Sequence, residues 1–277
     1  MTLLAVPNIS EGRDHQALKA IGKAFETNGA RLLDRHEDPD HNRAVYTLAG
    51  EPGRLAQAVL EGAREAIARI DLTAHEGQHP RVGAIDVAPI VYLDDRARGA
   101  AIAEALVLAD ALGREGLPVY LYGALAGGRT RAELRRGGPE ALLTRVAPDY
   151  GPARLHPTAG AVLVAARPPL VAFNVELAPP ATLEDARRIA ALIREGGPEG
   201  LPQVRAIGVQ LAHAAQVSTN IEDHRAATPA DVVEAVRRHA AVVAAELVAL
   251  APAEALERFP GDVPLRNGAT IEERLGR

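Results

Sequence analysis

The chain has 277 residues, a length that corresponds to about two compact domains. Hydrophobic residues make up 47% and charged residues 24%, so the chain can bury a core, and bulk disorder is excluded. The net charge is −5, only two of the 31 basic residues are lysines, and aromatic residues amount to 3%. These values argue against nucleic acid as a partner, because nucleic-acid-binding surfaces are basic and often carry stacking aromatic side chains.

The absence of cysteine excludes disulfides, thiolate nucleophiles, iron–sulfur clusters and thiolate zinc sites. The start of the chain, MTLLAVPN, has neither the basic segment nor the long apolar segment of a signal peptide. The most apolar stretch, residues 240–252, is interrupted by Glu246 and is too short to cross a bilayer. We therefore expect a cytoplasmic protein that does not contact a membrane.

Hydrophobic periodicity and turn residues predict a β-α-β-β-α-β order in the first 93 residues. Asp14 is the expected N-cap of the first helix, which places Leu18, Ile21 and Phe25 on one face. This order is typical of a ferredoxin-like unit. The strands are expected at residues 2–6, 31–34, 44–48 and 85–93, and the helices at residues 14–29 and 52–70.

The last hundred residues repeat this order of elements. Strands are expected at residues 170–177, 204–211 and 216–221, and helices at 182–194 and from Thr228 onward. Residues 247–250 either form a last strand or continue the preceding helix. A helix at residues 96–113, a strand at 118–122 and two short helices separate the two halves. We predict an α+β protein of two ferredoxin-like subdomains, residues 1–167 and 168–277.

Polar and apolar residues alternate along the strands of the second half. Phe173, Val175 and Leu177 point to one side of the sheet, whereas Asn174 and Glu176 point to the other. Helices of an α+β unit cover one sheet face, so the polar face either is solvated or lines a ligand groove closed by the first unit. The other residues expected on this face are Gln210, Gln216, Ser218 and Asn220.

The segment His75-Glu-Gly-Gln-His79 matches the H-E-x-x-H pattern of zinc hydrolases. That pattern requires a continuous helix, but Gly77 weakens a helix and Pro80 disfavours a helical conformation at His79. A zinc hydrolase is therefore one alternative, and a structural role for His79 is another. We favour a third role for His79, a general acid/base on a loop, because histidine exchanges protons near neutral pH.

Other nucleophile and phosphate-binding motifs are missing from the sequence. Its two serines, Ser10 and Ser218, do not lie in G-x-S-x-G, and there is no P-loop or strand-linked G-x-G-x-x-G. Residues 38–43, DPDHNR, form a turn rich in charged and amide groups before a strand. Residues 149–160 form a loop bounded by glycine and proline, which suits either a linker or a wall against a flat ligand.

Eight segments spread over nearly the whole chain resemble the formiminotransferase domain family. They are VPNISEGR (6–13), LLD with DPDHNR (32–43), GQHPRVGAIDV (77–87), PVYLYG (118–123), APDYGP (147–152), VAFNVEL (171–177), AQVSTN (215–220) and ELVALAP (246–252). The resemblance implies two subdomains whose sheets face each other across a folate tunnel, and a homodimer. A cyclodeaminase domain is not expected within these 277 residues, so a separate cyclodeaminase is one conceivable partner.

The resemblance also assigns roles to individual residues. His79 matches the family's catalytic histidine. The segment that matches the folate-binding loop consists of Gly151, Pro152, Ala153, Arg154, Leu155, His156, Pro157, Thr158, Ala159 and Gly160. The chain departs from the family pattern at Ala124, at Ala244-Ala245 before the final strand, and at His36, where the family has an aspartate that would orient the catalytic histidine. Asp38 and Asp40 are the candidates for that orienting role.

The implied reaction moves a formimino group from N-formimino-L-glutamate to N5 of tetrahydrofolate, giving 5-formiminotetrahydrofolate and L-glutamate. Arg43 and Arg81 are the candidates for binding the glutamate carboxylates, since a guanidinium pairs with a carboxylate bidentately, and Asn42 lies beside them. Tetrahydrofolate is expected as a co-substrate, with no metal. Two alternatives remain open beside the zinc hydrolase: a non-catalytic module that binds folate or an amino acid, and a transferase with a formyl donor.

Overall fold

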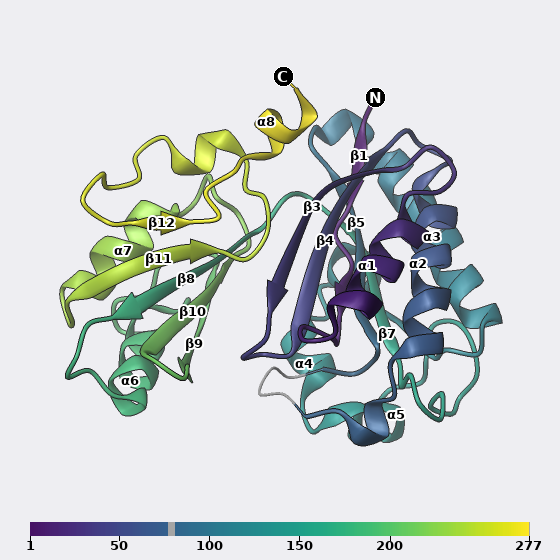
Figure 1. Ribbon diagram of the computed structural model, residues 1–277, viewed down its shortest axis with the longest axis horizontal. Coiled ribbons are helices and arrows are strands. Elements are labelled where there is room, and N and C mark those ends of the chain that lie inside the picture. The colour runs from purple at the N-terminus through teal and green to yellow at the C-terminus, as the bar shows by residue number, and fades with distance from the viewer. Residues whose placement is uncertain (77–80, 277) are drawn as a thin grey trace. The chain divides into compact units, whose positions relative to one another are not determined.

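The computed structural model describes residues 1–76 and 81–276 and divides into two compact units, Met1–Pro168 and Pro169–Arg277. Each unit is built around its own mixed β-sheet, with seven strands in the first and five in the second (Figure 1). The expected α+β class is therefore confirmed. None of the described helices is long and apolar enough to cross a membrane.

The first unit follows the predicted β-α-β-β-α-β order except that two short strands, and not one, precede the first helix. Its strands are β1 (Leu3–Ala5), β2 (Asn8–Ile9), β3 (Arg31–Asp38), β4 (Arg43–Gly50), β5 (Ile85–Tyr92), β6 (Val119–Leu121) and β7 (Val162–Arg167). Its helices are α1 (His15–Phe25), α2 (Leu55–Arg69), α3 (Arg98–Arg114), α4 (Arg131–Arg135) and α5 (Gly138–Arg145), with short 3-10 turns η1 (Leu72–Ala74), η2 (Asp95–Ala97) and η3 (Gly123–Ala126). The Asp14 carboxylate accepts hydrogen bonds from the backbone of Gln16 and Ala17, which confirms the predicted N-cap of α1.

The strands of the first unit are ordered β3-β4-β1/β2-β5-β7-β6 across the sheet. Strands β1 and β2 both lie between β4 and β5 and pair antiparallel with them, whereas β7 pairs parallel with β5 and β6. Strands β3 and β4 form an antiparallel hairpin whose register sets Asp38 opposite Arg43. This hairpin brings charged side chains to its closed end.

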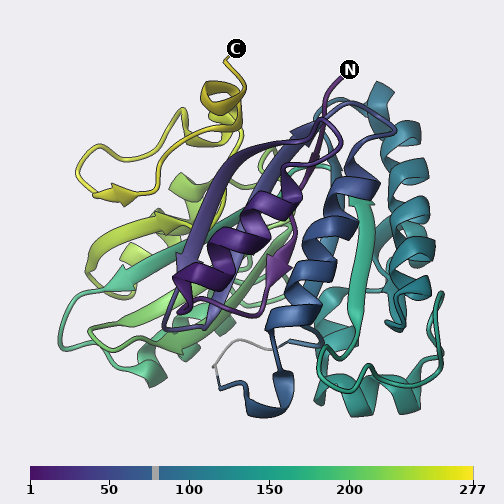
Figure 2. The ribbon, with the colours of Figure 1, turned by 45° about the vertical axis from the view of Figure 1, so that its right-hand side comes forward.

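Helices α1, α2 and α3 lie side by side on one face of the first sheet (Figure 2). They bury an apolar core that includes the predicted face of α1, Leu18, Ile21 and Phe25. On the opposite face, Leu134 of α4 and Leu142 of α5 belong to a smaller cluster of apolar residues from β5, β6 and β7. The β5-β7-β6 part of the sheet is therefore covered on both faces, as is common for parallel strands.

The second unit repeats the element order with strands β8 (Val171–Leu177), β9 (Val204–Gln210), β10 (Ala215–Ile221), β11 (Val242–Leu247) and β12 (Leu265–Arg266). Its helices are α6 (Leu183–Ile193), α7 (Pro229–Arg237) and α8 (Ile271–Leu275), with the 3-10 turn η4 (Ala253–Leu256). The strand order is β12-β11-β8-β10-β9, antiparallel except for the β11–β12 pair. The predicted alternation in β8 is confirmed, because Phe173, Val175 and Leu177 all belong to the apolar core.

Two sequence predictions are wrong. Strand β7 was not expected, since its run VLVAAR lacks alternation; it is buried along nearly its whole length as an inner parallel strand. The last long strand is β11 at 242–247 and not residues 247–250. Ala244 and Ala245 therefore lie inside that strand and not before it.

Candidate active site

A small pocket in the first unit lies where the turns after β2 and β3 meet the start of β5. It is lined by Ser10, His41, Asn42, Arg43, Arg81 and Asp86. The three residues predicted to bind the substrate, Asn42, Arg43 and Arg81, are therefore brought together in one place. The strand order brings these segments together, because β2 lies between β4 and β5.

Asn42 ties three segments of the pocket wall together. Its Oδ1 accepts a hydrogen bond from the Gly12 backbone N–H at 2.9 Å, and its Nδ2 donates to the Glu76 carbonyl at 2.8 Å. Its φ of +48° is a left-handed conformation that asparagine tolerates better than most residues. Gly12 is also required here, since a Cβ would lie only 2.4 Å from the Asp38 carbonyl oxygen.

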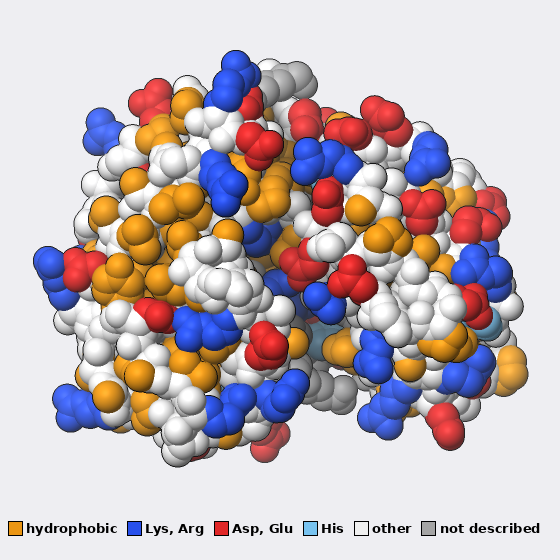
Figure 3. All heavy atoms as spheres, turned by 180° about the vertical axis from the view of Figure 1, so that it is seen from behind, with side chains coloured by type: hydrophobic (Ala, Val, Ile, Leu, Met, Phe, Trp, Pro, Cys, Tyr) orange, Lys and Arg blue, Asp and Glu red, His pale blue; other side chains and the backbone are white. Residues whose placement is uncertain are grey.

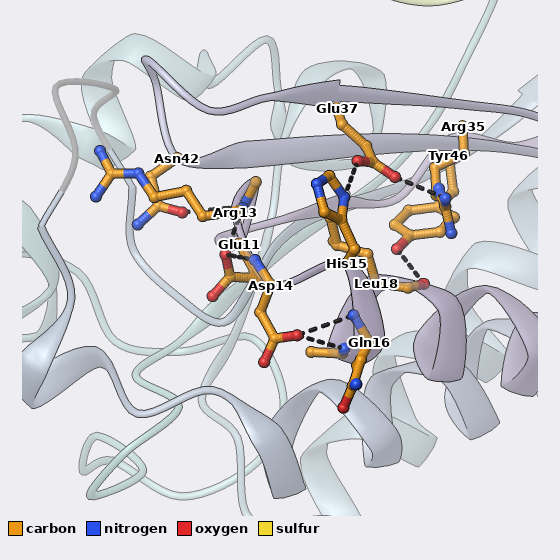
Figure 4. A network of polar contacts seen from close by, with 12 residues as sticks. Glu11, Arg13, Asp14, His15, Gln16, Leu18, Arg35, Glu37, Asn42 and Tyr46 are labelled. Atoms are coloured by element: carbon orange, nitrogen blue, oxygen red, sulfur yellow. Dashed lines mark hydrogen bonds and ion pairs between the residues drawn. The ribbon is translucent and has the colours of Figure 1, made fainter.

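The segment that faces Asn42 is itself held by a carboxylate (Figure 4). Glu11 Oε1 accepts hydrogen bonds from the backbone N–H groups of Gly12, Arg13 and Asp14 at 2.7–3.0 Å. The Gly12 N–H bond to Asn42, and a bond from Arg13 Nε to the Pro39 carbonyl at 3.0 Å, join this chain segment to the β3–β4 turn. The backbone of this part of the pocket is consequently pre-ordered before any ligand binds.

His41 and Asp38 form a close pair at the turn between β3 and β4. His41 Nδ1 lies 2.6 Å from Asp38 Oδ2, and the His41 backbone N–H donates to Asp38 Oδ1 at 2.9 Å. Burial raises the pKa of Asp38, but these hydrogen bonds outweigh burial and hold the pKa below its usual value. Of the two predicted orienting residues, Asp38 is thus engaged with His41, and Asp40 is exposed.

Arg43 and Arg81 bring positive charge into the pocket. The pKa of Arg43 is lowered to about 10, mainly by burial and also by the charges of Arg135 and Arg131, whereas Asp38 and Asp86 act against this lowering. Arg43 Nε is buried and makes no hydrogen bond within the described part of the chain. Arg81 Nη2 donates to the His75 carbonyl at 2.8 Å, and burial also lowers its pKa. Two partly desolvated guanidinium groups form a strong site for carboxylates.

Asp86 and Arg135 were missed by the sequence analysis. Asp86, on β5, is buried, accepts the Val82 backbone N–H at 2.7 Å and forms an ion pair with Arg135 at the end of α4. The two residues are 49 positions apart, so no local spacing indicated their pairing. Sequence reasoning could identify Asp86 only as part of the GAIDV segment.

His79, the predicted acid/base, lies outside the described residues. His75 follows the turn η1 in an extended conformation, with φ −83° and ψ 126°, so no helix starts there as the H-E-x-x-H pattern of a zinc hydrolase requires. Burial, and then the charge of Arg81, lower the pKa of His75. Both of its ring nitrogens are buried without a partner of hydrogen-bond geometry among the described residues, although the backbone of Asn42 and Ser10 lies nearby.

The predicted folate segment, Gly151–Gly160, contributes none of the side chains that line the pocket. Its second half is fixed by backbone hydrogen bonds, for example from Ala84 N–H to the Ala159 carbonyl at 2.9 Å. Gly83 makes this packing close, because a Cβ there would lie 1.7 Å from the Ala161 carbonyl oxygen. The Gly83 carbonyl in turn accepts a hydrogen bond from the hydroxyl of the pocket residue Ser10 at 2.7 Å. Gly83 therefore connects the segment to the pocket wall.

The polar face of the second sheet carries a cluster of its own around the buried carboxylate of Glu176. Arg266 pairs with Glu176, and His213 Nε2 lies 3.4 Å from Glu176 Oε1. Gln216 is directly opposite Glu176 in the sheet, and its Oε1 is a buried acceptor without a hydrogen bond in the described structure. An N–H group of a ligand would satisfy that acceptor.

Comparison with known families identifies the chain. Residues 2–167 match the N-terminal subdomain of the formiminotransferase domain, and residues 172–259 match the formiminotransferase domain itself. The protein therefore belongs to the formiminotransferase domain family.

Curated relatives support this assignment. The chain is 39% identical to the formimidoyltransferase-cyclodeaminase of Sus scrofa over 277 residues, which cover 91% of this chain and 50% of that protein. It is 37% identical to the glutamate formimidoyltransferase of Streptococcus pyogenes serotype M1 and 34% identical to that of Thermoplasma acidophilum, covering 89% and 88% of those proteins and 91% of this chain in each case. The chain thus spans about half the length of the two-function relatives.

A solved microcompartment protein from Desulfitobacterium hafniense DCB aligns with 89% of this chain and 93% of its own, at 11% identity and a TM-score of 0.25. That score is too low to indicate a shared fold.

Proposed function

We propose that the protein transfers a formimino group from N-formimino-L-glutamate to N5 of tetrahydrofolate, which is the activity of a glutamate formimidoyltransferase. The observation that carries this proposal is the arginine-lined pocket of a chain that belongs to the formiminotransferase domain family. The donor has two carboxylates, and Arg43 and Arg81 supply two guanidinium groups for them. Asn42 fixes the turn that positions Arg43.

The reaction needs a bond from N5 of tetrahydrofolate to the amidine carbon and cleavage of the bond from that carbon to the glutamate nitrogen. The N5 proton has to leave, and the departing glutamate nitrogen has to gain a proton. One neutral histidine can take the first proton and return the second, which we assign to His79. Fixing two substrates in one orientation supplies much of the remaining acceleration.

Tetrahydrofolate is proposed to bind through the segment Gly151–Gly160 and the polar face around Glu176 and Gln216. A rigid, glycine-bounded segment suits a flat ring, and the unsatisfied Gln216 oxygen suits a ring N–H. The shared strand order of the two sheets supports two ferredoxin-like subdomains. The folate tunnel, the homodimer, a cytoplasmic location, a separate cyclodeaminase partner and the absence of a metal remain proposals that rest on the family resemblance.

Steady-state kinetics with tetrahydrofolate and either N-formimino-L-glutamate or N-formyl-L-glutamate tests the proposal. We expect saturable transfer from the formimino donor and formation of L-glutamate in equal amount. Transfer from the formyl donor alone would change the substrate, and binding of both ligands without any turnover would point to a non-catalytic module.

A further inference from the structure

The buried ion pair between Asp86 and Arg135 is not used by the function proposed above. The side chain of Asp86 is 3% exposed and that of Arg135 is 14% exposed. Asp86 is one of the residues that line the pocket, and Arg135 reaches it from the end of α4. A buried ion pair is weak evidence for stability, because the cost of desolvating two charges offsets most of their attraction. Its position suggests a role in setting the charge of the pocket.

Most of the charged groups that line this pocket or act on Arg43 are arginines. Arg43 and Arg81 line it, and Arg131 and Arg135 lie close enough for their charges to act on Arg43. The opposing carboxylates are Asp86 and Asp38; Asp38 Oδ2 lies 2.6 Å from His41 Nδ1 and 4.0 Å from Arg43 Nη2. Among these six groups, the arginines outnumber the aspartates by two.

Asp86 alone would oppose an anionic ligand. A carboxylate in the pocket wall repels the carboxylates of a donor and competes with them for Arg43 and Arg81, and this repulsion is strong where water is excluded. Arg135 compensates the charge of Asp86 from outside the set of lining residues. Asp86 can then hold the backbone at Val82, next to Arg81, without cancelling the charge of either binding arginine.

We propose that Arg135 is a positioning residue for the donor: it neutralises Asp86, so that Arg43 and Arg81 are left to bind the two carboxylates of a glutamyl group. The proposal rests on the proposed function for the identity of the donor. It assigns to the pocket a preference for dicarboxylates, set by a residue that does not itself line the pocket. A purely structural role, in which Arg135 only anchors α4 to β5, predicts a loss of stability without a selective rise in the KM of the donor.

The test compares three variants by steady-state kinetics. Arg135→Gln leaves Asp86 uncompensated and should raise KM for N-formimino-L-glutamate about 10- to 100-fold, with KM for tetrahydrofolate and kcat within about threefold of wild type. Asp86→Asn combined with Arg135→Gln removes both charges and should return the donor KM to within about threefold of wild type. Arg135→Lys keeps the charge and should also stay near wild type.

Arg129→Gln is the matched control. Arg129 pairs with Asp149 at 2.6 Å, and Asp149 also accepts one backbone N–H, from Leu121 at 2.7 Å, as Asp86 does from Val82. This pair lies in the same unit but not at the pocket. A donor KM that rises equally in Arg129→Gln and Arg135→Gln would overturn the proposal, and so would a double variant as weak as Arg135→Gln.

Calorimetric binding of glutarate, a bare five-carbon dicarboxylate, separates this proposal from the proposed function. Glutarate affinity should fall in Arg135→Gln and recover in the double variant, whether or not the wild type turns over any donor. Turnover by the wild type with unchanged glutarate affinity in Arg135→Gln would overturn only the role of Arg135. If Arg135→Gln does not fold, the double variant and Arg135→Lys still decide, because a loss of glutarate affinity above about tenfold in either contradicts charge compensation.

Discussion

Four strands of each unit follow the same order, β3-β4-β1-β5 in the first and β9-β10-β8-β11 in the second, but the two units hold their polar groups in different places. In the first unit, strands β6 and β7 extend the sheet, and α4 and α5 cover the second face of that extension with apolar residues. The charged residues of its pocket lie at turns and near strand ends, around Arg43 and Asp86. The described residues of the second unit form no such layer, and a polar cluster lies on the sheet face, around Glu176. One scaffold thus offers two kinds of site.

This difference suggests that the two units bind different substrates. A pocket of guanidinium groups selects by charge and suits a small dicarboxylate, whereas a sheet face with amides and a buried carboxylate selects by hydrogen bonding and suits a ring with several N–H groups. We expect the first unit to determine the KM of the donor and the second to contribute to the KM of tetrahydrofolate. On the face drawn in Figure 3, acidic and basic side chains are mixed on both units.

The largest expected effect lies in the first unit. His79→Ala should lower kcat by about 10²- to 10⁴-fold, because a general acid/base acts on the transition state, while tetrahydrofolate affinity changes little. The wild-type rate should rise through a pKa near that of an ordinary histidine, and this limb should vanish in the variant. A well-folded variant with near-wild-type turnover would move the assignment to His75 or His41.

The next largest effect concerns binding of the donor by the pocket of the first unit. Arg43→Gln should raise KM for the donor about 10- to 100-fold, the range expected for losing a hydrogen bond between charged groups, and leave KM for tetrahydrofolate within threefold. Arg35→Gln is the control on the same hairpin, since Arg35 pairs with Glu37 at 2.7 Å and does not line the pocket. Equal rises of both KM values in Arg43→Gln would contradict the assignment of the donor to the first unit.

The reciprocal variant lies on the second sheet. Glu176→Gln should raise KM for tetrahydrofolate about tenfold and spare the donor, because it weakens the buried cluster with Arg266 and His213. Glu199→Gln is its control, since Glu199 also pairs with an arginine and a histidine, at 3.0 Å from Arg238 and His239, but lies outside the sheet. The same KM for tetrahydrofolate in both variants would show that the polar face does not bind folate.

A smaller effect concerns the stability of the first unit. Burial lowers the pKa of His36 and of His75 below the ordinary value of 6.5. The unfolded chain then takes up protons before the folded chain does, so their contribution to stability is complete above pH 6.5 and is lost as the pH falls below it. Urea unfolding at pH 7.5 and 5.5 should show this loss. His36→Gln should flatten the pH dependence, because it removes one of these two groups.

The smallest expected effect is none at all. Exhaustive chelation should leave turnover within experimental error, since His75 is extended where a zinc-binding helix would have to begin. Metal analysis of the purified protein checks the same point. Stoichiometric zinc bound through His75 and His79 would instead favour the hydrolase alternative.

Local signals predicted much of the fold. Asp14 capped its helix as expected, and the capping box of Thr182 and Asp185 opened α6. Strand β7 could not be predicted in the same way, because a strand buried on both faces has no alternation to detect.

For the site, Asn42, Arg43 and Arg81 were visible as polar residues beside strands. Arg135 could not be recognised in this way, because only the packing of α4 against the sheet brings it to its partner Asp86.

Strand β7 also constrains how the chain can fold during synthesis. It pairs with β5, about 75 residues earlier in the chain, and it separates β5 from β6. Until residue 167 has left the ribosome, the edge of β5 that β7 will cover stays unpaired, and an open apolar edge strand favours intermolecular pairing. The charged pocket of the first unit can therefore assemble early, but the nascent chain stays prone to aggregation until β7 is inserted.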